Sequence, residues 1–214
     1  MKALSDCSLY AFVDTAYLNG RTPESLASEL CRGGADIIQL RAKNLSKAEV
    51  RQMGERIEPI TSGHGVWLVI NDYPDVATEV GAPLCHLGQE DFFDAGHLHV
   101  SDLRMEPVKI GLSSHAPAQA ERAIAAGADY IAIGPVWPTA TKPSAKPVTL
   151  DYVRWASANV KIPWFAIGGI TLQNISEVLA SGATRICVVS AILNSADSAK
   201  TCKEFKDRLT SARR

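Results

Sequence analysis

Short apolar segments alternate with helix-forming segments along almost the whole chain, and this alternation restricts the fold more than any other feature of the sequence. Eight apolar segments are rich in β-branched or aromatic residues and bounded by Gly or Pro, as is typical of buried strands. They are Leu9–Val13, Asp36–Leu40, Val66–Ile70, Leu84–Leu87, Val108–Leu112, Tyr130–Ile133, Trp164–Ile167 and Arg185–Val189. Because alternating strands and helices build a parallel sheet, the pattern predicts an α/β fold.

The segments between these strands have helix signals of their own. Thr22 is placed as an N-cap, with Pro23 in the first helical position. The junction Gly-Gly-Ala-Asp at 33–36 returns as Ala-Gly-Ala-Asp at 126–129 and as Ser-Gly-Ala-Thr at 181–184. A repeated junction of this kind indicates one αβ unit used several times.

Eight such units in 214 residues predict a single (β/α)₈ TIM barrel that spans residues 1–214 as one domain. The main alternative is a doubly wound open sheet. In its dinucleotide-binding form that fold has a Gly-x-Gly-x-x-Gly turn after its first strand, and 13–16 (Val-Asp-Thr-Ala) contains no glycine. The barrel is therefore the favoured fold.

The charge and apolar patterns exclude several classes of partner. A net charge of −1, with 21% charged residues, provides no overall field to attract nucleic acid or an anionic membrane. No segment approaches the roughly 20 apolar residues that a membrane span needs. Five scattered cysteines without a Cys-x-x-Cys pair fit a reducing compartment. We expect a cytoplasmic protein that binds small molecules; the sequence leaves open whether it forms a homo-oligomer.

In a barrel of this type the chemistry gathers where the strands end. Seven consecutive expected strands end in polar, Gly-rich or charged residues, and this predicts one shared site at the barrel mouth. These ends are Gln39–Lys43, Asn71-Asp72, His86–Asp91, Gly111–His115, Gly134–Lys142, Gly168-Gly169 and Val189-Ser190.

The end of the second expected strand supplies an anion-binding face. Gln39, Arg41 and Lys43 alternate along the chain, so in an extended segment they face the same side. Two cations and an amide suit a polyanion that also has a hydrogen-bonding group. The alternative is a pair of solvated basic side chains at an ordinary strand end.

The loop after the sixth expected strand is the other basic segment. Thr139 and Thr141 can donate through hydroxyls, and Lys142 adds a compact positive charge. This inventory suits an oxyanion, most simply a phosphate. For this loop alone, a solvated polar turn is an equally good interpretation. The Pro138–Pro147 stretch is also a candidate lid.

Two carboxylates at neighbouring strand ends, Asp72 and Asp91, are candidate ligands for Mg²⁺, which typically takes one or two carboxylates with substrate oxygens and waters. An alternative for Asp72 is an N-cap of the helix expected near Pro74. Other carboxylates that compete for the metal-binding role are Asp75, Glu90 and Asp94.

The seventh and eighth strand ends, Gly168-Gly169 and Val189-Ser190, occupy a frequent phosphate site of these barrels. Tight turns that need glycine only for backbone freedom are the alternative. His115 is a candidate acid or base, or else a helix-start residue with a structural hydrogen bond.

These motifs occur in a definite order along the chain. They are Gln-Leu-Arg-x-Lys (39–43), Asn-Asp (71–72), His-Leu-Gly-Gln-Glu-Asp (86–91), Gly-x-Ser-x-His (111–115), Gly-Pro-x-x-Pro-Thr-x-Thr-Lys (134–142), Ile-Gly-Gly-Ile (167–170) and Val-Val-Ser-Ala-Ile (188–192). Each is weakly specific, but the ordered set is highly specific and resembles the thiamine phosphate synthase family. Many family members have Arg after Asn-Asp, where this chain has Tyr73, and the first 20 residues match only loosely.

The resemblance implies a TIM-barrel transferase that joins an aminopyrimidine-methyl diphosphate to a thiazole phosphate, plain or carboxylated, and releases diphosphate. The residues implied to hold the pyrimidine diphosphate are Gln39, Arg41, Lys43, Asn71, Ser113 and Lys142. Those implied to hold the thiazole phosphate are Thr139, Thr141, Gly169, Val189 and Ser190. The resemblance also implies Mg²⁺ as cofactor on Asp72 and Asp91, and catalytic roles for Arg41, Ser113 and Lys142.

Three other functions are compatible with a phosphate-binding barrel. A thiazole tautomerase would use His115 as its acid and base and would need neither the carboxylate pair nor the Arg-x-Lys face. A phosphosugar isomerase would need a carboxylate base that the strand ends do not clearly offer. A non-catalytic sensor of thiamine phosphate would not need the metal and diphosphate residues.

Overall fold

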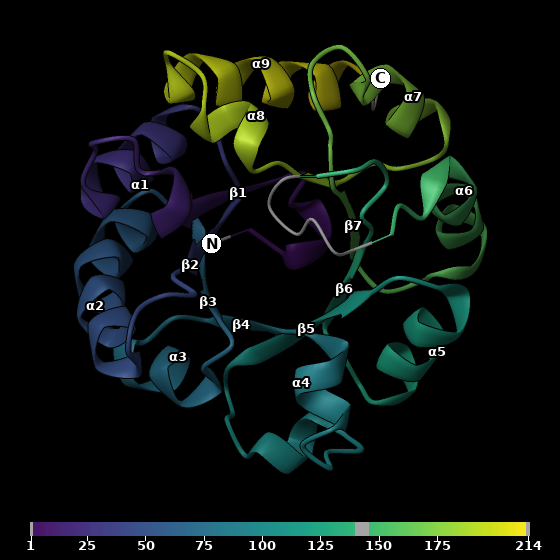
Figure 1. Ribbon diagram of the computed structural model, residues 1–214, viewed down its shortest axis with the longest axis horizontal. Helices are drawn as coiled ribbons and strands as arrows, with labels where there is room; N and C mark the ends of the chain where they lie inside the picture. Colours follow the sequence, from purple (N-terminus) through teal and green to yellow (C-terminus); the bar gives the residue numbers. More distant parts are fainter. Residues whose placement is uncertain (1, 140–145, 213–214) are drawn as a thin grey trace.

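The computed structural model describes residues 2–139 and 146–212 of the chain. Its eight parallel strands pair in sequence order and the last returns to the first, so the sheet closes into a barrel (Figure 1). The predicted (β/α)₈ fold is confirmed. The strands are β1 Leu9–Asp14, β2 Ile37–Arg41, β3 Trp67–Asn71, β4 Leu84–Leu87, β5 Lys109–Ser114, β6 Tyr130–Ile133, β7 Trp164–Ile167 and β8 Ile186–Cys187.

Helices surround this ring of strands on the outside (Figure 1). The first begins as the sequence predicts, because the Thr22 side chain accepts a hydrogen bond from the Ser25 N–H and Pro23 follows it. The described helices are α1 Pro23–Arg32, α2 Lys47–Gly63, α3 Pro74–Val80, α4 Gln89–Phe93, α5 Pro117–Ala125, α6 Thr149–Asn159, α7 Ile175–Ala180, α8 Ser190–Leu193 and α9 Ser198–Ser211. Short 3₁₀ turns are η1 Leu4–Asp6, η2 Thr15–Tyr17 and η3 Val100–Leu103.

The last strand is shorter than its apolar run suggests. Regular pairing covers Ile186–Cys187 rather than the expected Arg185–Val189. Val188 still donates a backbone hydrogen bond to the Tyr10 carbonyl, at 2.9 Å. The backbone then leaves the extended conformation at Val189, with φ −110° and ψ −92°, and α8 begins at the next residue. The strand ends early because the chain turns into a helix at the barrel mouth.

Large aromatic side chains fill the barrel interior. Tyr10 and Tyr130 are fully buried, and both make edge-on contacts with Phe165, with ring centroids 5.5 and 5.8 Å apart. Gly111 lies opposite Tyr130 in the register of β5 and β6. A Cβ atom at Gly111 would lie 2.0 Å from the tyrosine ring, so only glycine leaves room for it. This aromatic layer forms the floor of the site described below.

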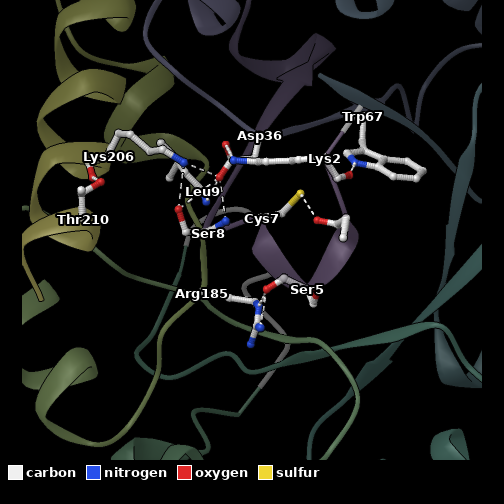
Figure 2. Close-up of polar contacts among 11 residues, drawn as sticks. Lys2, Ser5, Cys7, Ser8, Leu9, Asp36, Trp67, Arg185, Lys206 and Thr210 are labelled. Atoms are coloured by element: carbon white, nitrogen blue, oxygen red, sulfur yellow. Dashed lines mark hydrogen bonds and ion pairs between the residues drawn. The ribbon is translucent and has the colours of Figure 1, made fainter. Parts of the chain in front are cut away.

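The opposite, N-terminal end of the barrel contains a buried ionic cluster (Figure 2). Asp36 precedes β2 and is only 6% exposed. Its carboxylate accepts hydrogen bonds from the side chains of Lys2 and Lys206 and from the amides of Ser8 and Leu9, the latter two at 2.6 and 3.0 Å. The cluster therefore connects the N-terminal segment, β1, β2 and α9.

The cluster stabilises the ionised form of Asp36 but not the ionised form of Lys206. Burial tends to raise the pKa of Asp36, but the donated hydrogen bonds outweigh it and hold the pKa at about 2. The pKa of Lys206 lies below its ordinary value, because burial and repulsion by Lys2 outweigh the attraction to Asp36. Removing Asp36 would leave two partly buried cations uncompensated.

In the part of the chain that the structure describes, no helix is both long and apolar enough to cross a bilayer.

Candidate active site

The carboxyl ends of the strands surround a cavity above the aromatic layer. Residues from all eight strands or the loops that follow them line it, as expected for the catalytic face of a barrel. The sequence-predicted residues among them are Gln39, Arg41, Asn71, Ser113, Thr139, Gly169, Val189 and Ser190. The fold therefore brings together most of the residues that the sequence singled out.

The remaining predicted residues lie elsewhere. Lys43 and Asp72 form an ion pair with each other and do not line the cavity. Asp91 is exposed in the first turn of α4, with its carboxylate against the backbone of Gly88. Two further predicted residues, Thr141 and Lys142, fall outside the described residues, as does most of the candidate lid.

Arg41 is held by a buried carboxylate that the sequence analysis missed. Asp14, only 1% exposed, accepts a hydrogen bond from the Arg41 guanidinium at 2.7 Å and another from the Ala16 N–H at 3.0 Å. The two side chains meet because Asp14 pairs with Arg41 in the register of β1 and β2. The sequence does contain a signal for this contact, because Asp14 is a polar residue at the end of the first strand. This was the one strand end to which the sequence analysis gave no role.

A chain of buried hydrogen bonds runs beneath the cavity from β2 to β5. Gln39 donates from Nε2 to the Tyr10 hydroxyl at 2.7 Å, and that hydroxyl lies 3.2 Å from the hydroxyl of Tyr130. Tyr130 in turn contacts Nδ1 of His86 at 3.2 Å, and Nε2 of His86 contacts the Ser113 hydroxyl at 3.0 Å. Two predicted ligand-binding residues, Gln39 and Ser113, are thus joined through three residues to which the sequence analysis gave no role.

All members of this chain are neutral near pH 7. Burial lowers the pKa of His86 to about 4, and the positive charge of Lys43 acts in the same direction. Burial also raises the pKa of Tyr10 and of Tyr130 well above the ordinary value for tyrosine. The imidazole therefore has one N–H and one lone pair, and both phenols keep their protons.

His115 contributes to the wall of the cavity at the end of β5. Its Nδ1 lies in hydrogen-bonding contact with the Gly134 carbonyl, and its backbone N–H donates to the Gln119 side chain at 2.7 Å. Its Nε2 is buried without a partner among the described residues. Both sequence-based interpretations survive, since the residue has a structural hydrogen bond and also faces the cavity.

The two glycines after β7 are required by the backbone itself. Gly168 and Gly169 have φ angles of 101° and 65°, and added Cβ atoms would lie 2.3 Å from Pro135 and 2.7 Å from Trp137. Their carbonyls are occupied, because the Trp137 N–H donates to Gly168 at 3.2 Å and the Asn174 side chain donates to Gly169 at 2.9 Å. The turn is therefore a tight structural junction that also lines the cavity.

The carboxylate pair suits a hard divalent cation only with help from a ligand. The alternative role of Asp72 as a helix cap is wrong, because α3 begins after Tyr73 without a side-chain cap. Within residues 2–139 and 146–212, no group of three or more His, Cys, Asp or Glu side chains is gathered for a metal. The oxygens of Asp72 and Asp91 still fit Mg²⁺, which commonly uses one or two carboxylates and completes its shell with substrate oxygens and waters.

Comparison with known proteins agrees with this geometry. The family model described as thiamine monophosphate synthase matches residues 9–192. The chain is 42% identical over 190 residues to the thiamine-phosphate synthase of Thermus thermophilus, covering 88% of this chain and 87% of that protein. It is 41% identical over 218 residues to that of Acidothermus cellulolyticus, covering 99% and 100%.

A solved structure gives the same result. The thiamine phosphate pyrophosphorylase of Pyrococcus furiosus superimposes with a TM-score of 0.88 at 30% identity, covering 98% of each chain. The matched region includes all eight strands and every strand end that lines the cavity. The chain therefore belongs to the thiamine monophosphate synthase family.

Proposed function

We propose that this cavity joins 4-amino-2-methyl-5-(diphosphooxymethyl)pyrimidine to a thiazole phosphate, forming thiamine phosphate and releasing diphosphate. The observation that supports it best is the convergence of Gln39, Arg41, Asn71, Ser113, Thr139 and Ser190 on one cavity of a family barrel. The enzyme is a transferase of the pyrimidine-methyl group.

The diphosphate end of the first substrate is assigned to the basic side of the mouth. Arg41 lines the cavity with its guanidinium oriented by Asp14, so its remaining N–H groups can donate to an oxyanion. Lys43 is 48% exposed and pairs with Asp72, a contact that a bound anion can replace. Lys142 would approach from the loop after β6. Asn71, Gln39 and Ser113 would hold the remainder of the substrate.

The phosphate of the thiazole substrate is assigned to the opposite side, at Thr139, Thr141, Gly169, Val189 and Ser190. Both glycines of the 168–169 turn line the cavity, and their backbone N–H groups can donate to an anion there. Either the plain or the carboxylated thiazole phosphate would use this subsite.

Asp72 and Asp91 are the residues that would hold Mg²⁺. When bound, the cation supplies charge neutralisation for the diphosphate oxygens. A cation on Asp72 would compete with Lys43 for the carboxylate, and a displaced Lys43 would be available to the diphosphate.

The chemistry follows from where charge develops. Breaking the bond between the methylene carbon and the diphosphate oxygen leaves an anion and a pyrimidine-methyl cation that the ring amino group stabilises. Arg41, Lys43 and Lys142 would stabilise the departing anion. The thiazole nitrogen, positioned by its phosphate, then bonds to the methylene carbon without losing a proton, so no dedicated base is needed.

The direct test mixes purified protein, Mg²⁺, the pyrimidine diphosphate and either thiazole phosphate, and measures thiamine phosphate and diphosphate. Metal-dependent formation of both products in equal amounts supports the proposal. Isomerisation of the thiazole without coupling would instead identify a tautomerase, and binding of thiamine phosphate without turnover would identify a sensor.

Single substitutions test the assignments of two residues. Lys142→Ala and Asp91→Ala should each lower turnover by about 10²–10³-fold while the circular dichroism spectrum is unchanged, by comparison with loss of one oxyanion-stabilising contact. Lys146→Ala and Asp94→Ala, which remove exposed charges a few residues away, are the matched controls. Wild-type turnover in a test variant would refute the role of that residue.

A further inference from the structure

We infer that Arg21, in the loop between β1 and α1, is a positioning residue for the thiazole phosphate. Its side chain lies outside the cavity. It acts through the short helix α8, which begins at Ser190 directly after Val189, two residues assigned to that phosphate. The inference rests on the proposed function and goes beyond it, because it gives a role to a residue that the substrate does not touch.

The guanidinium of Arg21 joins two segments that are 172 positions apart in the sequence. Within its own loop it donates from Nε to the Leu18 carbonyl at 2.8 Å and from Nη2 to the Tyr17 carbonyl at 3.0 Å. Nη2 also donates to the carbonyl of Leu193, the last residue of α8, at 2.7 Å. Because an arginine only donates and a carbonyl only accepts, the direction of these hydrogen bonds is fixed.

Two further contacts hold the guanidinium in this place. Its Nη1 donates to the hydroxyl of Ser198, the first residue of α9, and lies 3.6 Å from the carboxylate of Glu29 on α1. The Ser198 hydroxyl in turn donates to the Ile192 carbonyl at 3.1 Å. Arg21 is only 19% exposed, so the loop, α1, α8 and α9 meet around one largely buried cation.

Asn19 supports the same end of α8. Its side-chain amide donates to the Leu193 carbonyl at 3.2 Å and to the side-chain oxygen of Asn194 at 3.3 Å. The last carbonyls of a helix have no partner within the helix and carry partial negative charge. The loop therefore presents a cation and an amide where α8 needs donors.

This end of α8 is connected directly to the phosphate subsite. The Leu193 N–H donates to the Val189 carbonyl at 3.0 Å, and the Asn194 N–H donates to the Ser190 carbonyl at 2.9 Å. Val189 and Ser190 both line the cavity. One residue therefore lies between each contact of the loop and a residue assigned to the phosphate.

The helix needs such contacts because it is very short. A single helical turn fixes several backbone angles for few hydrogen bonds, so it is unfavourable in water on its own. α8 has only four residues and no side-chain cap at its start. Its order must come from outside, and a misplacement of about 1 Å at a substrate contact can cost up to roughly 10²-fold in activity.

The first experiment uses the two substrates as controls for one another. In steady-state kinetics, Arg21→Gln should raise the KM for thiazole phosphate about tenfold and leave the KM for the pyrimidine diphosphate within about twofold of the wild type. The second value should hold because Asp14 orients Arg41 through the pairing of β1 with β2. An equal rise in both KM values, or a rise in neither, would overturn the inference.

Arg21→Lys separates geometry from charge. Lysine keeps the positive charge, but one ammonium group lacks the planar fork that reaches carbonyls of two segments at once. The KM for thiazole phosphate should therefore stay raised, by about fivefold or more. Recovery of the wild-type KM in this variant would mean that charge alone matters and would overturn the positioning role.

Arg185→Gln is the matched control. This guanidinium also donates to a backbone carbonyl, that of Ser5, at 2.6 and 3.2 Å (Figure 2). It directly precedes β8, the strand that leads to the phosphate subsite, but lies at the opposite end of the barrel. The control should keep the wild-type KM for both substrates, and a rise in the KM for thiazole phosphate equal to that of Arg21→Gln would overturn the inference.

Calorimetry measures the same effect without turnover. Thiazole phosphate titrated into the enzyme without the pyrimidine diphosphate should show a Kd raised about tenfold in Arg21→Gln and about threefold in Asn19→Gly. Glycine readily adopts the φ of 51° found at Asn19, so the second variant removes only the side-chain contacts. If Arg21→Gln failed to fold, wild-type affinity in Asn19→Gly would overturn the inference.

The outcomes separate this inference from the proposed function. If the wild type couples the two substrates but Arg21→Gln keeps the wild-type KM for thiazole phosphate, only the role of Arg21 fails. If the wild type binds thiazole phosphate without coupling, the proposed reaction fails and the calorimetric comparison still tests Arg21. If the wild type does not bind thiazole phosphate, both fail together.

Discussion

Acid should weaken the barrel through one carboxylate far from the catalytic cavity. The pKa of Asp36 falls from its ordinary value of 3.8 to about 2 in the folded chain. At roughly 1.4 kcal/mol per pKa unit, the ionised carboxylate contributes about 2 kcal/mol of stability above pH 4. Because the folded value is the lower one, this contribution is lost as the pH falls from about 4 through 2. About 1 kcal/mol, near half, is lost by pH 3.

The assay is urea unfolding of the wild type and of Asp36→Asn at pH 6 and at pH 3. The difference between their free energies of unfolding isolates Asp36 from the other carboxylates, since these titrate in both proteins. That difference should shrink by about 1 kcal/mol at pH 3. Asp151→Asn, which removes a carboxylate that is 87% exposed and forms an ion pair with Arg154, should show no such change.

A difference that stays constant or widens at pH 3 would refute the reasoning. It would mean that the pKa of Asp36 in the folded chain does not lie below its value in the unfolded chain. The hydrogen bonds from Lys2, Lys206 and the two amides would then not offset the burial of the carboxylate.

Three further predictions concern the active site and the aromatic layer beneath it. Asp14→Asn should raise the KM for the pyrimidine diphosphate about tenfold, with a smaller effect on kcat, because Arg41 loses its orienting charge. The control variant Asp129→Asn removes a similar contact with Lys109 at the other end of the barrel and should change neither constant. Gly111→Ala should lower the free energy of unfolding by roughly 1–3 kcal/mol in urea titrations, because the new methyl group overlaps the Tyr130 ring. An unchanged free energy of unfolding would contradict the close contact between position 111 and this ring. Lys43→Gln should tighten Mn²⁺ binding by the diphosphate-free enzyme several-fold in spin-resonance titrations, since Asp72 loses its competing cation. The control variant Lys47→Gln breaks the nearby exposed pair with Asp75 and should leave the Mn²⁺ affinity unchanged. Equal effects of the two substitutions would argue against Asp72 as a ligand.

The sequence was sufficient for the barrel because the signals that define it are local. The alternation of apolar runs with helix caps such as Thr22 requires only neighbouring residues, and each strand end follows its own run. Once the fold is a barrel, the strand ends must meet. This is why Gln39, Ser113 and Ser190 were found to line one cavity although 151 positions separate the first from the last (190 minus 39).

The contacts that orient those residues could not be predicted in the same way. Tyr10 and Tyr130 are 120 residues apart and each belongs to an apolar strand, where a tyrosine is first taken as a packing residue. The pairing of Asp14 with Arg41 depends on strand register, which the sequence pattern does not define. The sequence pattern also could not predict two features of the backbone. Asp72 adopts a left-handed conformation with φ 68°, and β8 ends early where α8 begins.

Positions 111 and 130 can be exchanged only as a pair. They face one another across neighbouring strands, and the ring of one occupies the volume that any side chain of the other would need. Across related barrels, a larger residue at the first position should therefore coincide with a smaller one at the second. A barrel that made this exchange would keep its core volume but lose the phenol between Tyr10 and His86, so one glycine decides whether the two sides of the barrel interior are joined by hydrogen bonds.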